Sequence, residues 1–200
     1  MTKILVFDLG GVLIDWNPRY LYRKLIDDEG DINLFLSEVC NSEWNVKQDA
    51  GRALAEATAE RIALFPEKKS LIEAFYDRWE EMLGGEINET VEILRELKNK
   101  GESIYALTNW SGETFPIAEE RFDFLQWFDG TLVSGVEKMA KPDPAIFHLL
   151  LKRYELRAED CLFIDDSKTN IEAAARIGFE THHFNSAAGL RQELIAANLL

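Results

Sequence analysis

The chain has 200 residues, of which 36 are acidic and 22 are basic, so its formal net charge is −14. This length accommodates one domain of ordinary size or a main domain with a smaller insert, and a hydrophobic fraction of 46% excludes wholesale disorder. The acidic balance and the lack of a basic run exclude a nucleic-acid binder and argue against docking on an anionic membrane.

The first expected element is a buried strand, Ile4–Phe7, an apolar run that ends at Asp8. From about Trp16 to Gly85 the sequence then shows helical periodicity and no convincing strand. The clearest example is an apolar stripe at i, i+3, i+4 and i+7 spacing. Its members are Ile72, Phe75, Tyr76, Trp79, Met82 and Leu83. An insert of about 70 residues is too long for a loop, so we expect a small helical domain over a sheet.

After this insert, helical and strand patterns alternate. Asn88–Lys100 is expected to be a helix with Asn88 as its N-cap, a second helix opens at Pro142 and Pro144, and a third closes with Ala173–Ile177. The strands expected around these helices are Ser103–Leu107, Thr131–Ser134, Cys161–Ile164 and, more weakly, Thr181–Phe184. Near-continuous apolar runs between helices are typical of a parallel sheet that is covered on both faces.

The alternation therefore predicts an α/β fold built on a doubly wound parallel sheet. We expect a core domain of residues 1–15 and 87–200, and a small all-helical cap domain of residues 16–86. In an open parallel sheet, ligands bind beyond the C-terminal ends of the strands. The polar residues at those ends are therefore the candidates for chemistry.

Seven polar residues stand at or near these strand ends. They are Asp8 after the first strand, Thr108 and Asn109 after the second, Lys141 in the loop before the next helix, and Asp165 and Asp166 after the fourth, with Asn170 one helical turn further on. Three carboxylates packed together repel one another, which raises at least one pKa unless a cation neutralises them. Mg²⁺ is a suitable cation because it binds a few hard oxygens and keeps several waters. Beside it, Asp8 is suited to attack phosphorus, while Lys141 and Thr108 hold phosphoryl oxygens.

In this order, the segments that carry these residues resemble the four motifs of the haloacid dehalogenase superfamily. The segments are Phe-Asp8-Leu-Gly-Gly-Val, Leu-Thr108-Asn, Lys141-Pro-Asp-Pro, and Ile-Asp165-Asp166-Ser with Asn170. The spacing matches the subgroup with a helical cap after the first strand, and the resemblance covers essentially the whole chain. It implies a Rossmann-like core and a magnesium-dependent phosphatase. The implied substrate is a small phosphomonoester, with a sugar phosphate as one candidate, and the implied intermediate is an aspartyl-phosphate on Asp8.

The resemblance also implies roles for the matching positions. The expected catalytic residues are Asp8 as nucleophile, Thr108, Lys141 and Asp165. The expected substrate contacts are Thr108, Asn109 and Lys141, and the expected Mg²⁺ ligands are Asp8, the backbone carbonyl of Gly10 and Asp166. The expected partner is a small phosphorylated metabolite, with neither a nucleic acid nor a membrane.

One position departs from the pattern of the family's phosphatases. They usually carry a second aspartate two residues after the nucleophile, where it protonates the leaving oxygen and then activates water, and this chain has Gly10. General acid–base catalysis, worth about 10²–10⁴-fold, must therefore come from elsewhere or be lost, and Asp15, a cap residue or solvent could supply it. Alternatively, the leaving group needs little help, as an anomeric oxygen does. The cap residues that could face the site are Trp16, Asn17, Arg19, Gln48, Asp49, Gly51 and Arg52.

Two other functions stay open. A 2-haloacid dehalogenase would use Asp8 without a metal and would not need the second aspartate. Such enzymes resemble the family with a Ser-Asn pair in the fourth motif, whereas Asp165 and Asp166 stand intact here, which favours the phosphatase. A non-catalytic binding protein is favoured only by Gly10. Each segment alone is compatible with a turn or a helix cap, and it is their joint occurrence that indicates a catalytic site.

The sequence also bears on the compartment. Cys40 and Cys161 are far apart and indicate neither a disulfide framework nor a zinc site. The first apolar run is too short for a signal peptide, and no run approaches the roughly 18 residues of a membrane span. We therefore expect a cytoplasmic protein, and nothing in the sequence indicates its oligomeric state.

Overall fold

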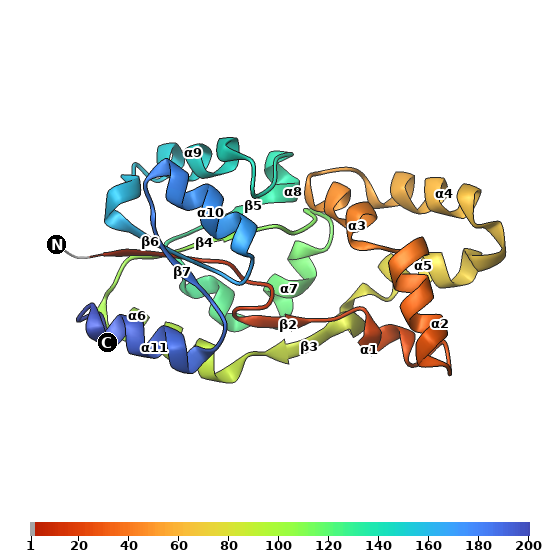
Figure 1. Cartoon of the computed structure of the whole chain (residues 1–200), viewed down its shortest axis with the longest axis horizontal. Helices are drawn as coiled ribbons and strands as arrows, with labels where there is room; N and C mark the ends of the chain where they lie inside the picture. The colour runs from red at the N-terminus through yellow and green to blue at the C-terminus, as the bar shows by residue number, and fades with distance from the viewer. Residues whose placement is uncertain (1–2) are drawn as a thin grey trace.

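The computed structural model describes residues 3–200 and contains a parallel sheet between two helical layers, with a helical part to one side (Figure 1). The strands of the sheet are β1 (Ile4–Phe7), β4 (Ile104–Thr108), β5 (Gly130–Val133), β6 (Cys161–Asp165) and β7 (Glu180–His183). They lie in the order β5-β4-β1-β6-β7, and every neighbouring pair is parallel. Because β1 is central and the chain crosses to both sides of it, the sheet is doubly wound, as the sequence predicts.

Different helices cover the two faces of the sheet. In Figure 1 the lower layer contains α6 (Asn88–Lys100) and α11 (Ala187–Ala196), and the upper layer contains α9 (Pro144–Arg153) and α10 (Lys168–Ile177). Shorter elements are α7 (Phe115–Arg121), η4 (Asp123–Trp127), α8 (Ser134–Glu137) and η5 (Ala158–Asp160). The expected N-cap of α6 is wrong, because Ile87 holds that place and Asn88 is already helical.

Alternate side chains of each strand point to opposite faces, which divides the core into two clusters. In β1, Leu5 and Phe7 pack in the cluster that includes α6 and α11, whereas Val6 packs in the cluster that includes α9 and α10. All three side chains are fully buried. This burial on both faces explains why the strands are continuous apolar runs in the sequence rather than alternating ones.

Between β2 (Ile14–Trp16) and β3 (Leu83–Glu86), the chain forms the helical part, which we call the helical insert (residues 17–82). Its elements are α1 (Arg19–Tyr22), α2 (Glu29–Leu34), the π-helical η1 (Phe35–Val39), α3 (Ser42–Asp49), α4 (Leu54–Leu64), η2 (Pro66–Lys68), α5 (Lys69–Asp77) and η3 (Trp79–Met82). Buried aromatic rings hold these elements together. The ring of Trp44 meets that of Phe75 edge-on at 5.1 Å, and the rings of Tyr22 and Phe35 lie 4.7 Å apart.

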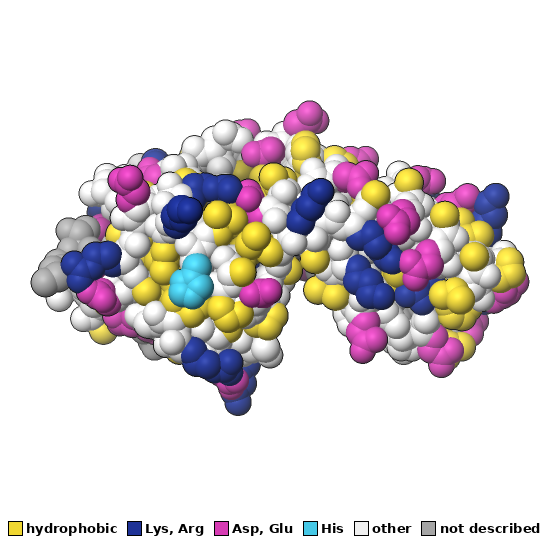
Figure 2. Space-filling model, turned by 90° about the horizontal axis from the view of Figure 1, so that it is seen from above, with side chains coloured by type: hydrophobic (Ala, Val, Ile, Leu, Met, Phe, Trp, Pro, Cys, Tyr) yellow, Lys and Arg dark blue, Asp and Glu magenta, His cyan; other side chains and the backbone are white. Residues whose placement is uncertain are grey.

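The core and the helical insert form two lobes with a notch between them, and acidic and basic side chains are interspersed over the face in Figure 2. Among residues 3–200, no helix has the length and apolar content that a membrane crossing requires. Cys40 and Cys161 are both buried and free.

Two short antiparallel strands, β2 and β3, join the helical insert to the core. The expectation that no strand interrupts residues 16–85 is therefore wrong at both ends. Gly84 and Gly85 hide β3 in the sequence, because glycine is depleted in strands. A Cβ at Gly84 would overlap the carboxylate of Asp15 and would lie 2.8 Å from the Tyr20 ring. Gly84 thus allows these two side chains to pack against β3.

We predict that Gly84→Ala destabilises the protein by about 1–3 kcal/mol, since the added methyl group overpacks the contact with Asp15 and Tyr20. The measurement is the midpoint of urea unfolding. The control is Gly189→Ala on α11, where the new Cβ would be 3.4 Å from its nearest neighbour, Ser186 Oγ. A glycine-to-alanine change within a helix stabilises by about 0.5–1 kcal/mol. Equal shifts in the two variants would contradict the close packing at Gly84.

Candidate active site

The C-terminal ends of β1, β4 and β6 bring the expected polar residues to one edge of the sheet. Asp8 follows β1, Thr108 ends β4 and Asp165 ends β6, and these strands are neighbours. Lys141 reaches the same point from the loop before α9. Oxygens of Asp8, Asp165 and Asp166 lie within 4.8 Å of one another. Four segments that are far apart in the sequence therefore meet in one site.

Lys141 occupies the centre of this site and is only 2% exposed. Its Nζ lies 2.7 Å from Asp165 Oδ2 and 3.0 Å from Asp8 Oδ1, and it donates a hydrogen bond of 2.8 Å to the carbonyl of Leu107. Burial disfavours the ammonium form, but the negative charges of Asp8 and Asp165 outweigh this effect and raise the pKa of Lys141. Lys141 therefore stays charged and fixes the position of both carboxylates.

Asp165 is fully buried, and protein donors use both of its oxygens. Oδ1 accepts from the Ser167 N–H at 2.7 Å, and Oδ2 accepts from Lys141 at 2.7 Å. The side-chain amide of Asn170 lies 3.1 Å from each oxygen. A carboxylate has about four acceptor positions, so the surrounding protein satisfies Asp165. Its role in this structure is to hold Lys141 and the turn after β6.

Asp8 is bound less completely. Its Oδ1 accepts from the Leu9 N–H at 2.8 Å and contacts Lys141, whereas no residue of the described chain donates a hydrogen bond to Oδ2. Burial raises the pKa of Asp8 to about 7; Lys141 opposes this shift and Asp165 adds to it. Asp166 is exposed as a residue, but partial burial of its carboxyl group and the charge of Asp165 raise its pKa as well. Both groups would be stabilised in their charged form by a nearby cation.

The donor set fits a divalent cation. Three carboxylates against one ammonium leave a formal excess of two negative charges in this cluster. Carboxylate and carbonyl oxygens are the ligands that Mg²⁺ prefers. Gly11 has a φ of +73°, and a Cβ at this position would overlap the carboxylate of Asp166. The glycine loop after β1 therefore lets Asp166 come close to the backbone that follows the nucleophile candidate.

Thr108 and Asn109 use their polar atoms in different ways. Thr108 is 1% exposed, and its Oγ1 has no hydrogen-bond partner among the described residues. A buried hydroxyl without a partner costs about 1–3 kcal/mol, so this group is suited to bind a ligand oxygen. The Asn109 amide instead accepts from the Lys141 N–H at 2.8 Å and donates to the Lys141 carbonyl at 2.9 Å. The Asn109 side chain thus holds the backbone of Lys141.

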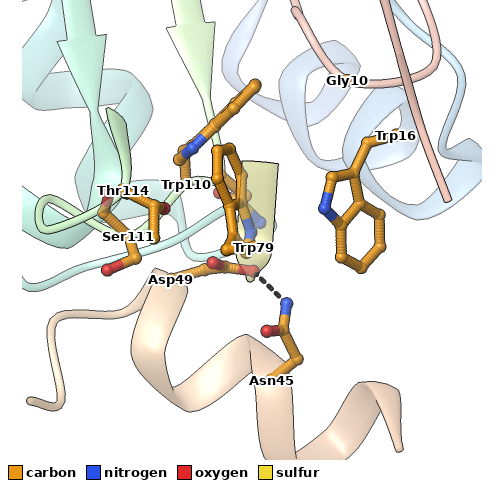
Figure 3. Close-up of a pocket in the computed structure, with 9 residues that line it drawn as sticks. Gly10, Trp16, Asn45, Asp49, Trp79, Trp110, Ser111 and Thr114 are labelled. Carbon is orange, nitrogen blue, oxygen red and sulfur yellow. Dashed lines mark hydrogen bonds between the residues drawn. The ribbon is translucent and has the colours of Figure 1, made fainter. Parts of the chain in front are cut away.

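A cavity of about 200 Å³ separates the strand ends from the helical insert, as Figure 3 shows. Trp16, Trp79 and Trp110 form much of its wall, with Gly10 on the core side and Asp49 on the insert side. A larger cavity of about 700 Å³ shares Trp16 and Asp49 with it and extends to Lys141 and Asp166.

Two of the expected cap residues, Trp16 and Asp49, thus line the cavity. The other expected cap residues contact protein groups instead. Asn17 accepts from the Arg19 N–H, and Arg19 pairs with Glu29. The Gln48 amide donates to the Trp44 carbonyl and the Tyr76 hydroxyl, Arg52 pairs with Glu60, and Gly51 packs against Lys138. The sequence stripe places Trp79 in the core, and its ring is indeed buried but also lines the cavity. Trp110 and Ser111 were missed, although their position directly after Asn109 is a signal for them.

Comparison with known proteins identifies the class. The model of the haloacid dehalogenase-like hydrolase family matches residues 2–178, so the chain belongs to this family of hydrolases. The sesquiterpene phosphatase astK of Aspergillus oryzae is 28% identical, and the match covers 96% of this chain and 94% of that protein. The phosphorylated carbohydrates phosphatase of Thermotoga maritima is also 28% identical, over 89% of this chain and 82% of its own length.

Solved structures share the fold. The enzyme bt-2542 of Bacteroides thetaiotaomicron, an Asp-to-Ala mutant in complex with magnesium and inorganic phosphate, is 23% identical with a TM-score of 0.71, over 92% of this chain and 95% of that one. The L-2-haloacid dehalogenase of Xanthobacter autotrophicus, with chloropropionic acid covalently bound, is 18% identical with a TM-score of 0.64, over 100% of this chain and 85% of that one. The same fold therefore holds magnesium and inorganic phosphate in one of these proteins and a covalently bound chloropropionic acid in the other.

We predict that Asp8→Asn stabilises the metal-free protein at pH 8. Burial raises the pKa of Asp8 to about 7 in the folded state, whereas a free aspartate has a pKa of 3.8, so ionisation of Asp8 costs stability as the pH rises between these values. Removing the charge should recover about 1–3 kcal/mol at pH 8 and little at pH 4, since one pKa unit corresponds to about 1.4 kcal/mol.

The measurement is thermal unfolding in EDTA at both pH values. Asp165→Asn is the matched contrast, because its carboxylate is satisfied by Lys141, Ser167 and Asn170. Breaking this buried pair should destabilise the protein by about 3 kcal/mol. A loss of stability at pH 8 in Asp8→Asn comparable with that in Asp165→Asn would contradict the assigned cost of ionisation.

Proposed function

We propose that this protein is a magnesium-dependent phosphatase that hydrolyses a small phosphomonoester through an aspartyl-phosphate on Asp8. The observation that carries the proposal is the buried hydroxyl of Thr108, which lies at the sheet edge where Asp8 and Lys141 meet and has no hydrogen-bond partner in the described part of the chain. An oxygen donor without a partner, a fixed ammonium and a carboxylate with one free oxygen form a receptor for a phosphoryl group. The phosphatase names of the relatives support the same conclusion.

Each residue then has a role. The free Oδ2 of Asp8 attacks phosphorus, the bond to the leaving oxygen breaks, and water later hydrolyses the acyl phosphate. Thr108 and Lys141 hold phosphoryl oxygens, and Asn109 keeps the Lys141 loop in place. Asp8, the backbone carbonyl of Gly10 and Asp166 would hold Mg²⁺. When bound, this ion neutralises charge on the phosphoryl group and on the carboxylates.

The helical insert has a role in the same scheme. Together with Trp16 at the end of β2 and with β3, it makes up residues 16–86, which we propose act as a cap over the strand ends. The cap would exclude bulk water during phosphoryl transfer and would supply the contacts to the organic group. Trp16, Trp79 and Trp110 favour an organic group with an apolar face. A sugar phosphate meets this condition through the C–H face of its ring. The two free, buried cysteines fit the reducing cytoplasm in which we place the protein.

A dehalogenase is the second candidate, and the electrostatics of the site disfavour it. Burial keeps the pKa of Asp8 near 7, so without a cation a large fraction of Asp8 is protonated at neutral pH and is a poor nucleophile. Asp166 adds negative charge beside it, which a dehalogenase has no reason to retain. A non-catalytic binding protein would not need the partnerless Oδ2 of Asp8. Both alternatives are separated from the phosphatase by the assays below.

We predict hydrolysis of phosphate monoesters that requires Mg²⁺, stops in EDTA and is absent in Asp8→Asn. The measurement is phosphate release from a panel of esters with and without Mg²⁺, beside chloride release from 2-chloropropionate. A beryllofluoride adduct on Asp8 is expected in the presence of Mg²⁺. Chloride release that is indifferent to EDTA would establish the dehalogenase instead. The lack of any turnover and of the adduct would establish the binding protein.

We further predict that Thr108→Val lowers kcat about 10²-fold, because removal of one preorganised donor to a transition-state oxygen costs about 10²–10³-fold. The folded protein should lose no stability, since no described residue forms a hydrogen bond with this hydroxyl. Thr90→Val on α6 is the matched control, because Thr90 Oγ1 is also buried without a hydrogen-bond partner in residues 3–200 but lies in a helix that covers the sheet. If both variants keep full activity, Thr108 does not bind the phosphoryl group.

A further inference from the structure

We propose that Asp49, at the end of α3 in the helical insert, is the general acid and base for the leaving group. It takes the role for which Gly10 has no side chain. The inference rests on the proposed phosphatase function and assigns the proton transfers that this function requires.

The first observation is open space beside the nucleophile. A Cβ built on Gly10 would meet no atom of residues 3–200 within 4 Å, so no side chain of that range fills the volume of the missing aspartate. This space belongs to the cavity of about 200 Å³, which leaves room for the organic part of a small ester next to Asp8. A proton donor for the leaving oxygen must therefore reach into this cavity from another wall.

Asp49 occupies such a wall. Figure 3 shows its carboxyl group on the insert side of the cavity and Gly10 on the opposite side. The carboxylate accepts a hydrogen bond of 3.1 Å from Asn45, one turn earlier in α3. The backbone carbonyl of Asp49 accepts from Ser134 Oγ, which itself accepts from the Trp110 N–H at 2.9 Å. These contacts attach the end of α3 to the core and fix the carboxyl group relative to the strand ends.

The surroundings of Asp49 favour a carboxyl group that can hold a proton near neutral pH. Burial raises the pKa of Asp49 to about 7, and a hydrogen bond from the Ser111 backbone opposes this shift. Among the ion pairs of the described chain, none includes Asp49. The nearby titratable and charged groups have other partners. Tyr76 on α5 is hydrogen-bonded to Asn45 and Gln48, and Arg52 after α3 pairs with Glu60. Glu113 accepts from the N–H of Leu54, and Lys138 after α8 packs against Gly51. A group that titrates near neutral pH is suited to give and take a proton.

The other carboxyl groups near the site are engaged elsewhere. Asp15 accepts a hydrogen bond of 2.6 Å from the Tyr20 hydroxyl, packs on Gly84 and lines neither cavity. Of the carboxyl groups in residues 3–200, Asp49 and Asp166 are those that line the two cavities. Asp166 belongs to the cation cluster. Asp49 is therefore the acid left for the leaving group.

The two proton transfers balance. In the first step, Asp8 Oδ2 forms a bond to phosphorus, the bond from phosphorus to the ester oxygen breaks, and protonated Asp49 gives its proton to that oxygen, which leaves as an alcohol. In the second step, water attacks phosphorus, gives one proton to the Asp49 carboxylate, and displaces Asp8 with release of inorganic phosphate. The enzyme returns to its starting protonation state.

The test compares leaving groups in Asp49→Asn. For ethyl phosphate, whose alkoxide needs a proton, we expect kcat/KM to fall about 10²–10³-fold, within the range of general acid catalysis. For p-nitrophenyl phosphate, whose phenolate leaves unaided, kcat/KM should fall by less than about tenfold, because that step needs no acid. This ester should also give a burst of one equivalent of p-nitrophenol, since hydrolysis of the acyl phosphate slows.

Two further variants separate catalysis from structure. Asp15→Asn is the matched control and should leave the ratio between the two esters unchanged. Gly10→Asp in the Asp49→Asn background should restore ethyl phosphate hydrolysis, because the new carboxyl group enters the open space beside Gly10. Equal losses for both esters in Asp49→Asn, or the lack of rescue, would overturn the proposal.

The wild-type protein provides a second measurement if Asp49→Asn does not fold. Its kcat/KM for ethyl phosphate should decline as the pH rises above about 7, where Asp49 loses its proton, while kcat/KM for p-nitrophenyl phosphate should not. Identical profiles would overturn the proposal. Wild-type protein that hydrolyses both esters with Mg²⁺ but shows these contrary results rejects the role of Asp49 alone. Wild-type protein that hydrolyses no ester rejects the proposed function itself.

Discussion

The buried ammonium of Lys141, held between Asp8 and Asp165, is the interaction on which the rest of the site depends. Burying an unpaired charge costs several kcal/mol, so Asp165 requires Lys141, and Lys141 requires a carboxylate beside it. Asn109 holds the backbone of Lys141, and Asn170 with the turn after β6 satisfies Asp165. The result is a nucleophile candidate that is fixed in position while one of its oxygens stays free.

This cluster limits what the net charge of −14 implies about the ligands of the protein. As a bulk property, the charge argues against any anionic ligand. At the strand ends, however, the carboxylates of Asp8 and Asp166 belong to a cluster whose donor set fits a cation, and Lys141 lies beside them. The local charge is then set by a few groups at the strand ends, whereas the remaining acidic excess favours solubility and opposes binding of polyanions.

The sequence predicted the sheet and the convergence of its strand ends because both depend on strong local signals: apolar runs and polar residues directly after them. It did not predict β3, since Gly84 reads as a turn until the packing of Asp15 against it is known. The use of the Asn109 amide on Lys141 and the position of Asp49 depend on how distant segments meet. Contacts of this kind leave neither a hydrophobic periodicity nor a motif in a single sequence.

The hydroxyl of Ser134 joins Trp110 in the core to the last turn of α3. Strands β2 and β3 connect the same two lobes elsewhere. The helical insert is thus attached to the core at two places: by the chain itself through β2 and β3, and by the hydrogen bonds of Ser134. A movement wide enough to separate the tryptophan side chains of the cavity must break the hydrogen bonds of Ser134, whereas a small rotation about β2 and β3 need not.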